Sequence, residues 1–133
     1  RGSRAGRTDD AGSVDDRCDR LERGGLARRV VVDASHGNSR KDHEVQRVVA
    51  HDIASRLAAG EQGVVGVMLE SFLVPGRQDL GTELVYGQSV TDACIGWDST
   101  VTALERLADA ISRRRELVPS VSETSPTNPV RSP

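Results

Sequence analysis

Apolar residues recur along the chain in two patterns, and each pattern predicts a different kind of element. Between residues 42 and 59 they return every three or four positions, which is typical of an amphipathic helix. The same spacing predicts a short helix from about residue 13 to Gly24 and a final helix over residues 101–115. The apolar positions expected to face the core are Val14, Cys18 and Leu21; Val45, Val48, Val49, Ile53 and Leu57; and Leu104, Leu107, Ala108 and Ile111.

Local signals predict the ends of these helices. Ser13 with Asp16, and Thr102 with Glu105, have the spacing of a capping box, in which two side chains satisfy the first backbone N–H groups of a helix. Gly60 stands where the glycine after a helix is expected.

Two continuous apolar runs, residues 30–32 and 64–69, predict strands. Continuous apolarity, unlike alternation, is typical of a strand that is buried on both faces in a parallel sheet. The order helix, strand, helix, strand, helix then indicates a βαβα arrangement, with residues 74–96 as a long loop. Two parallel strands cannot cover both of their faces or close their edges. We therefore expect the chain, which begins with Arg1 and not Met, to form part of a larger α/β sheet.

Composition excludes several classes of function. The 133 residues suffice for one domain, and 18 Lys and Arg against 20 Asp and Glu give no field that would attract nucleic acid or a membrane. Three aromatic residues are too few for base stacking, and no apolar run approaches the roughly 20 residues of a membrane span. The N-terminus does not resemble a signal peptide, and two cysteines fit a reducing compartment. We expect a cytoplasmic protein.

Ionisable residues follow both predicted strands. His36 comes after the first strand and Glu70 after the second, while Asp92 lies in the loop that precedes the last helix. Loops converge at the carboxyl ends of parallel strands, so these three side chains are candidates for one site. Imidazole with two carboxylates suits Mn, Fe, Co or Zn. The alternative is that His36 and Asp92 cap turns and Glu70 is solvated.

Other chemically active residues have ordinary explanations. His43 and His51 lie on the predicted amphipathic helix, where surface or packing roles are expected. Cys94 is close to Asp92, and we interpret it as a small apolar group. Arg40 and Lys41 could meet a phosphate at the start of a helix or form a solvated charge pair.

Three segments, VVVDASHGNSRK, GVMLESFLVPGRQDL and LVYGQSVTDACIGWD, together resemble the C-terminal part of the type I 3-deoxy-D-arabino-heptulosonate 7-phosphate (DAHP) synthases. The resemblance extends over about residues 13–115. It implies an α/β fold in which residues 1–116 form the C-terminal portion, about the last two βα units, of a (β/α)₈ TIM barrel that is incomplete as a chain. Residues 117–133 are expected to form a disordered tail.

The resemblance also implies a site. In the family a divalent metal is held by a histidine, a glutamate and an aspartate that match His36, Glu70 and Asp92. A further cysteine ligand, from an early strand, has no counterpart here. His36 and Asp92 would be catalytic, and His36 would also contact substrate. The opening RGSRAG resembles a family segment whose arginine binds substrate phosphate, which matches Arg1.

The activity implied is condensation of phosphoenolpyruvate with erythrose 4-phosphate to DAHP and phosphate. This reaction opens the shikimate pathway to chorismate and the aromatic amino acids. We expect the intact enzyme to be a homo-oligomer, and this chain to be an inactive fragment when alone. The alternatives are an enzyme like 3-deoxy-D-manno-octulosonate 8-phosphate synthase, or a small non-catalytic α/β module.

Overall fold

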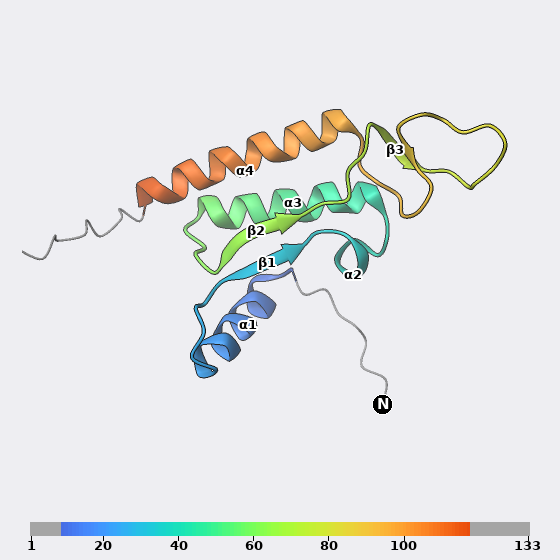
Figure 1. The fold of residues 1–133 in the computed structure, drawn as a ribbon. Coiled ribbons are helices and arrows are strands. Elements are labelled where there is room, and N and C mark those ends of the chain that lie inside the picture. The colour runs from blue at the N-terminus through green and yellow to red at the C-terminus, as the bar shows by residue number, and fades with distance from the viewer. Residues whose placement is uncertain (1–8, 118–133) are drawn as a thin grey trace, which may run out of the picture.

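The computed structural model describes residues 9–117. Arg1 and residues 118–133 of the predicted tail lie outside them, whereas Leu117, predicted to belong to the tail, ends the last helix. The elements, in chain order, are α1 (Ala11–Arg23), β1 (Val30–Asp33), α2 (His36–Ser39), α3 (His43–Ala58), β2 (Val64–Met68), β3 (Val74–Arg77), β4 (Gln88–Ser89) and α4 (Trp97–Leu117) (Figure 1).

The two predicted strands pair in parallel, which confirms the βαβ arrangement. Val30 lies opposite Val64 and Asp33 opposite Met68, with an irregularity after Val30 where β2 has one extra residue. The N–H of Ala34 donates to the carbonyl of Met68 at 2.9 Å, so the pairing continues just beyond the end of β1. This register brings the carboxyl ends of both strands to the same edge.

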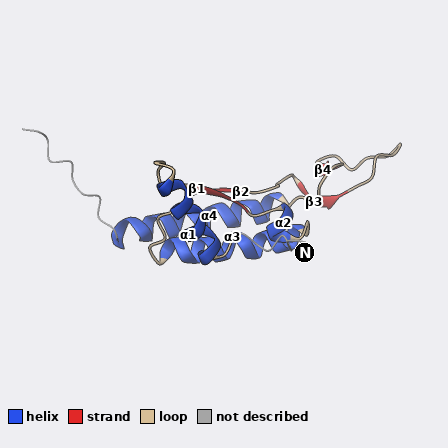
Figure 2. Cartoon of the chain, turned by 90° about the horizontal axis from the view of Figure 1, so that it is seen from below, coloured by secondary structure: helices blue, strands red, loops and turns tan. Residues whose placement is uncertain are grey.

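Within the described residues, helices cover one face of the β1–β2 sheet (Figure 2). The long helices lie on one side of β1 and β2 (Figure 2), where Val32 and Val64 are buried. Away from the helices, Val31 of β1 is 66% exposed and Val65 of β2 is 53% exposed. The prediction of burial on both faces is therefore wrong for residues 9–117, because the described helices cover one side alone.

The hydrophobic core lies between the sheet and helices α1, α3 and α4. Val49, Ile53 and Leu57 of α3 are buried as predicted, but Val48 is exposed. On α4, Leu107 and Ile111 pack against the core as predicted, while Leu104 and Ala108 are exposed. The buried face of α4 runs instead through small residues, Ala103 and Ala110. Small side chains at these two positions let α3 and α4 approach closely, and this close contact sets how α4 is rotated. Among the helix positions predicted for the core, Val48, Leu104 and Ala108 are exposed, and Leu21 of α1 is only partly buried.

The helix ends differ from the predicted capping boxes. Asp10, not Ser13, caps α1 by accepting the N–H of Ser13 at 3.0 Å. Thr102 lies inside α4, which begins five residues earlier at Trp97. Gly24 follows α1 as predicted, and Gly60, just after α3, has a φ of +106° that favours glycine.

The predicted loop 74–96 contains two short strands, β3 and β4, that pair with each other. The side chain of Gln78 holds the loop between β3 and β4 together. Its Nε2 donates to the carbonyl of Val85 at 2.8 Å, and its Oε1 accepts the N–H of Val85 at 2.8 Å. Strands of four and two residues are too short to show a repeating apolar pattern, so the sequence did not predict them. Within residues 9–117 no helix combines the length and apolarity needed to cross a membrane.

Candidate metal centre

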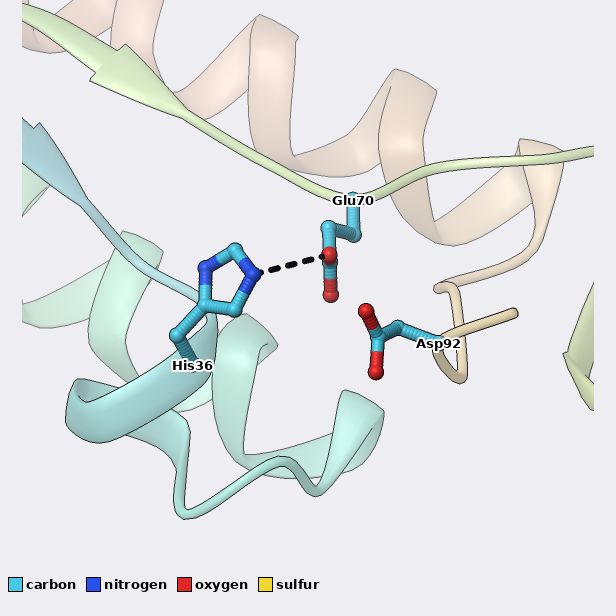
Figure 3. A group of neighbouring side chains, drawn as sticks. All are labelled: His36, Glu70 and Asp92. Carbon is cyan, nitrogen blue, oxygen red and sulfur yellow. Dashed lines mark ion pairs between the residues drawn. The ribbon is translucent and has the colours of Figure 1, made fainter.

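His36, Glu70 and Asp92 converge beyond the carboxyl ends of β1 and β2 (Figure 3). His36 begins α2, Glu70 follows β2 by two residues, and Asp92 lies between β4 and α4. Nε2 of His36 is 3.3 Å from Oε1 of Glu70, and one ligand atom from each of the three residues lies within 4.8 Å of the others. The predicted juxtaposition is present, and the role of these residues as ligands stays a prediction.

The chain after β1 turns sharply to present His36. Ser35 is the N-cap residue of α2, and His36 itself has a φ of +46°, in the left-handed region that L-residues avoid. Its Nδ1 lies 2.8 Å from Oδ2 of Asp33 and 2.8 Å from Oγ of Ser35. A strained residue whose ring is tied down on one side and faces two carboxylates on the other is typical of a functional position.

The charges around His36 favour its protonated form when no cation is bound. The hydrogen bond to Asp33, followed by the negative charges of Asp33, Glu70 and Asp92, raises the pKa of the His36 imidazole above its usual value. For Asp33 the largest single influence is burial, which works to raise the pKa. The hydrogen bonds from Ser35 and His36 together outweigh it, and the pKa of Asp33 is lowered. Asp33 is therefore an ionised acceptor beside the ring.

Glu70 is fixed through its backbone. Its N–H donates to Oε1 of Gln46 on α3 at 2.9 Å, and its carbonyl accepts the N–H of Ile95 at 2.9 Å. The side chain of Glu70 is only partly exposed and is directed toward His36 (Figure 3). The same contact with Ile95 ties the segment that carries Asp92 to the end of β2.

The segment of Asp92 is held by backbone pairing with β3. Cys94 and Gly76 exchange two hydrogen bonds of 2.8 and 3.1 Å, which anchor the chain just after Asp92. The Asp92 side chain itself is exposed and points toward the other two (Figure 3). Burial raises the pKa of the Cys94 thiol, so Cys94 is not primed as a thiolate.

The geometry fits a divalent cation. Nitrogen and carboxylate ligands lie about 2.0–2.2 Å from such an ion, so two atoms that share it are at most roughly 4.4 Å apart. The 3.3 Å between His36 and Glu70 meets this limit as it stands. The 4.8 Å bound on the whole group requires only a small movement of an exposed carboxylate. One nitrogen and two oxygen donors suit Mn, Fe, Co or Zn.

The other candidates lie apart from this group. His43 and His51 are on α3 and have acidic neighbours of their own, Glu44 at 3.7 Å and Asp52 at 4.0 Å. Two residues that the sequence did not single out do contribute: Asp33 through the His36 ring, and Gln46 through the Glu70 backbone. The position of Asp33, three residues before His36 at a strand end, was a signal for its role.

Comparisons with known proteins identify the family of the chain. The family model described as DAHP synthetase I family matches residues 1–105. The chain belongs to the DAHP synthetase I family. It is 45% identical over 122 residues to a phospho-2-dehydro-3-deoxyheptonate aldolase of Alternaria alternata, which covers 89% of this chain and 33% of that protein. With the Phe-sensitive aldolase of Escherichia coli K12 it is 46% identical over 97 residues, which covers 71% of this chain and 28% of the relative.

The fold is likewise similar to that of a solved family member. The structure of phospho-2-dehydro-3-deoxyheptonate aldolase from Francisella tularensis superposes with a TM-score of 0.81 at 42% identity, over 86% of this chain and 34% of that one. The chain thus spans about a third of the length of the relatives it matches.

Proposed function

We propose that this chain carries the metal-binding part of a DAHP synthase. The whole enzyme would condense phosphoenolpyruvate with erythrose 4-phosphate, giving DAHP and inorganic phosphate. The observation that carries the proposal is the convergence of His36, Glu70 and Asp92 from three separate segments in a chain of this family. Family membership favours the heptulosonate reaction over the octulosonate one and over a non-catalytic module.

His36, Glu70 and Asp92 would together hold one divalent cation, Mn, Fe, Co or Zn. When bound, such an ion polarises an aldehyde oxygen and stabilises negative charge that develops there. Two carboxylates would balance the charge of the dication, and the imidazole of His36 would add a neutral nitrogen ligand. Asp92 is the most exposed of the carboxylates at this position, so it has the freedom to orient a water molecule or accept its proton.

The rest of the site would come from elsewhere in the protein. We propose that β1 and β2 are two neighbouring strands of a (β/α)₈ barrel, a fold supported by the bare face of the sheet and by helices on the other face. Arg1, outside the described residues, would bind substrate phosphate. The intact enzyme would be a cytoplasmic homo-oligomer. That the 133-residue chain is inactive alone stays a prediction.

Cation binding and turnover in the same set of variants test the proposal. Glu70→Gln and Asp92→Asn remove one charged ligand each while keeping side-chain shape. Glu83→Gln is the matched control, because Glu83 is an exposed carboxylate outside the group. We expect both site variants to weaken Co²⁺ binding by about 10-fold or more, as measured by titration, and the control to bind like the wild type.

Turnover is measured as phosphate release from phosphoenolpyruvate that requires erythrose 4-phosphate, in the protein as it is expressed from its gene. We expect the two site variants to lose it and Glu83→Gln to retain it. Equal Co²⁺ affinity in all four proteins would refute the metal centre. Turnover that survives both site substitutions would refute the assigned roles.

A further inference from the structure

Three polar groups in the turn after β1 form a closed set of hydrogen bonds around Nδ1 of His36. Oδ1 of Asp33 accepts from the backbone N–H of Ser35 at 2.8 Å and from the Ser35 hydroxyl at 2.5 Å. Oδ2 of Asp33 lies 2.8 Å from Nδ1 of His36. Two donors from a single buried residue therefore fix the Asp33 carboxylate in one orientation, with its second oxygen against the imidazole.

The hydrogen count decides which ring nitrogen carries the proton. An ionised carboxylate only accepts hydrogen bonds, so Oδ2 of Asp33 requires a hydrogen on Nδ1. The Ser35 hydroxyl has one hydrogen and donates it to Oδ1 of Asp33, so its oxygen faces Nδ1 as a second acceptor at 2.8 Å. In the neutral ring the remaining nitrogen, Nε2, is then unprotonated. Nε2 is the atom that faces Glu70, at 3.3 Å.

We propose that Asp33 is a positioning residue, which locks the His36 ring in the Nδ1–H form and so presents a lone pair on Nε2 to the cation site. Ser35 supports this role by holding the carboxylate. The inference rests on the proposed metal centre for its purpose, while the hydrogen-bond arrangement itself is independent of any cation. Carboxylate groups behind a histidine ligand fix its tautomer and raise its basicity in this way.

The substitution Asp33→Asn makes the sharpest test, because it keeps the side-chain shape and replaces one acceptor by a donor. The two Ser35 donors require an oxygen at the Oδ1 position, so the amide of an asparagine occupies the Oδ2 position. That amide donates to Nδ1, and the ring proton must move to Nε2. The cation then loses its nitrogen ligand. The backbone carbonyl of residue 33 keeps its 2.7 Å contact with the Asn38 amide, so the turn is expected to fold.

The measurement is the ¹⁵N NMR tautomer signature of His36 in the cation-free protein, at a pH where the ring is neutral. The chain has three histidines, and the signal lost in His36→Gln identifies the one of interest. We expect Nδ1–H in the wild type and Nε2–H in Asp33→Asn. Asp16→Asn, an exposed aspartate on α1, is the matched control and should keep Nδ1–H.

Co²⁺ titration of the same proteins gives the second readout. We expect Asp33→Asn to bind about 10–100-fold more weakly than the wild type, and Ser35→Ala, which retains the carboxylate, to lose less. A wild-type ring with its proton on Nε2 overturns the proposal without recourse to any variant, as does an Asp33→Asn protein with an unchanged tautomer. If the tautomer switches but no form of the protein binds Co²⁺, the control of the tautomer by Asp33 stands, and the metal centre fails together with the purpose given to that control.

Discussion

The backbone N–H of Glu70 donates to the side-chain oxygen of Gln46, which lies 24 residues earlier on α3 and is 1% exposed. β2 ends at Met68, so at Glu70 the neighbouring strand no longer supplies an acceptor. Gln46 provides one, and it thereby fixes the direction in which the chain leaves the sheet. Gln46, a buried residue on the packing face of α3, thus helps to set the position of the Glu70 carboxylate in the candidate site.

Replacing Gln46 by methionine keeps most of its volume and removes the acceptor. We expect the free energy of unfolding to fall by about 1–3 kcal/mol, because the partly buried N–H of Glu70 is left without its partner. Urea unfolding followed by circular dichroism measures the change. The control is Gln62→Met, at an exposed position before β2, for which we expect a change within about 0.5 kcal/mol. Equal effects at the two positions would contradict the role given to Gln46.

Gly63 allows α1 to approach the start of β2. A Cβ atom at this position would lie 2.7 Å from Sγ of Cys18 and 3.1 Å from the Glu61 carboxylate. We expect Gly63→Ala to destabilise the protein by about 1–3 kcal/mol through overpacking. Gly37→Ala is the control, since nothing lies within 4 Å of a Cβ there.

A double substitution separates this clash from other costs of the alanine. Cys18→Ala removes the sulfur, so Gly63→Ala should cost less in that background than in the wild type. Thermal unfolding of the four proteins in the cycle measures the coupling. Strictly additive costs would show that contact with Cys18 is not the cause.

Much of the arrangement could be predicted because it depends on short-range patterns. Residues 30–32 and 64–69 are apolar runs of strand length, and α3 has a clear helical period, so the parallel pair and the strand ends followed from local information. His36 and Glu70 could be placed together because parallel strands bring their carboxyl ends to one edge. The placement of Asp92 depended on the resemblance to the family as well.

The features that were missed depend on contacts between distant segments. Val48 and Leu104 fit the helical spacing, yet the rotation of α3 and α4 about their axes is set by which faces meet, and both side chains are exposed. Gln46 is polar and would be assigned to solvent by its type, but its partner is a strand end 24 residues away. The left-handed conformation of His36 was missed because such a conformation is expected at glycine, and this position is a histidine.

The left-handed conformation of His36 leads to a prediction about stability. At this position the glycine variant is expected to be more stable than the alanine variant, which is the reverse of the order in a helix interior. At a φ of +46°, alanine in place of His36 is destabilised by about 1–2 kcal/mol in the folded state, and glycine is not. Glycine loses some of this advantage through its greater freedom in the unfolded chain. We expect His36→Gly to be more stable than His36→Ala by about 1 kcal/mol in cation-free urea unfolding.

The control for this order is His51, which is exposed and lies within α3. There we expect the glycine variant to be the less stable one, by about 1 kcal/mol, because glycine disfavours a helix interior. The same sign of the difference at both positions would contradict the left-handed geometry of His36.

The last prediction concerns the residue after Glu70. Ser71 and Thr100 of α4 have their hydroxyl oxygens 2.5 Å apart, and Oγ1 of Thr100 lies 2.9 Å from the Gly96 carbonyl. Because a carbonyl only accepts, Thr100 must donate to Gly96, and Ser71 must donate to Thr100. Thr100→Val keeps the shape and removes both bonds. We expect a loss of about 1–3 kcal/mol in the free energy of unfolding.

Thr102→Val provides a matched comparison on the same helix. Its hydroxyl also donates to a carbonyl four residues earlier, that of Asp98 at 2.9 Å, but it is exposed. Water replaces that bond when the hydroxyl is removed, so we expect a change within about 0.5 kcal/mol. Thr100→Val should also weaken Co²⁺ binding, since Ser71 adjoins Glu70, and Thr102→Val should not. If Thr100→Val lowers stability but leaves Co²⁺ affinity unchanged, the contact between Ser71 and Thr100 holds α4 against the end of β2 and does not shape the cation site.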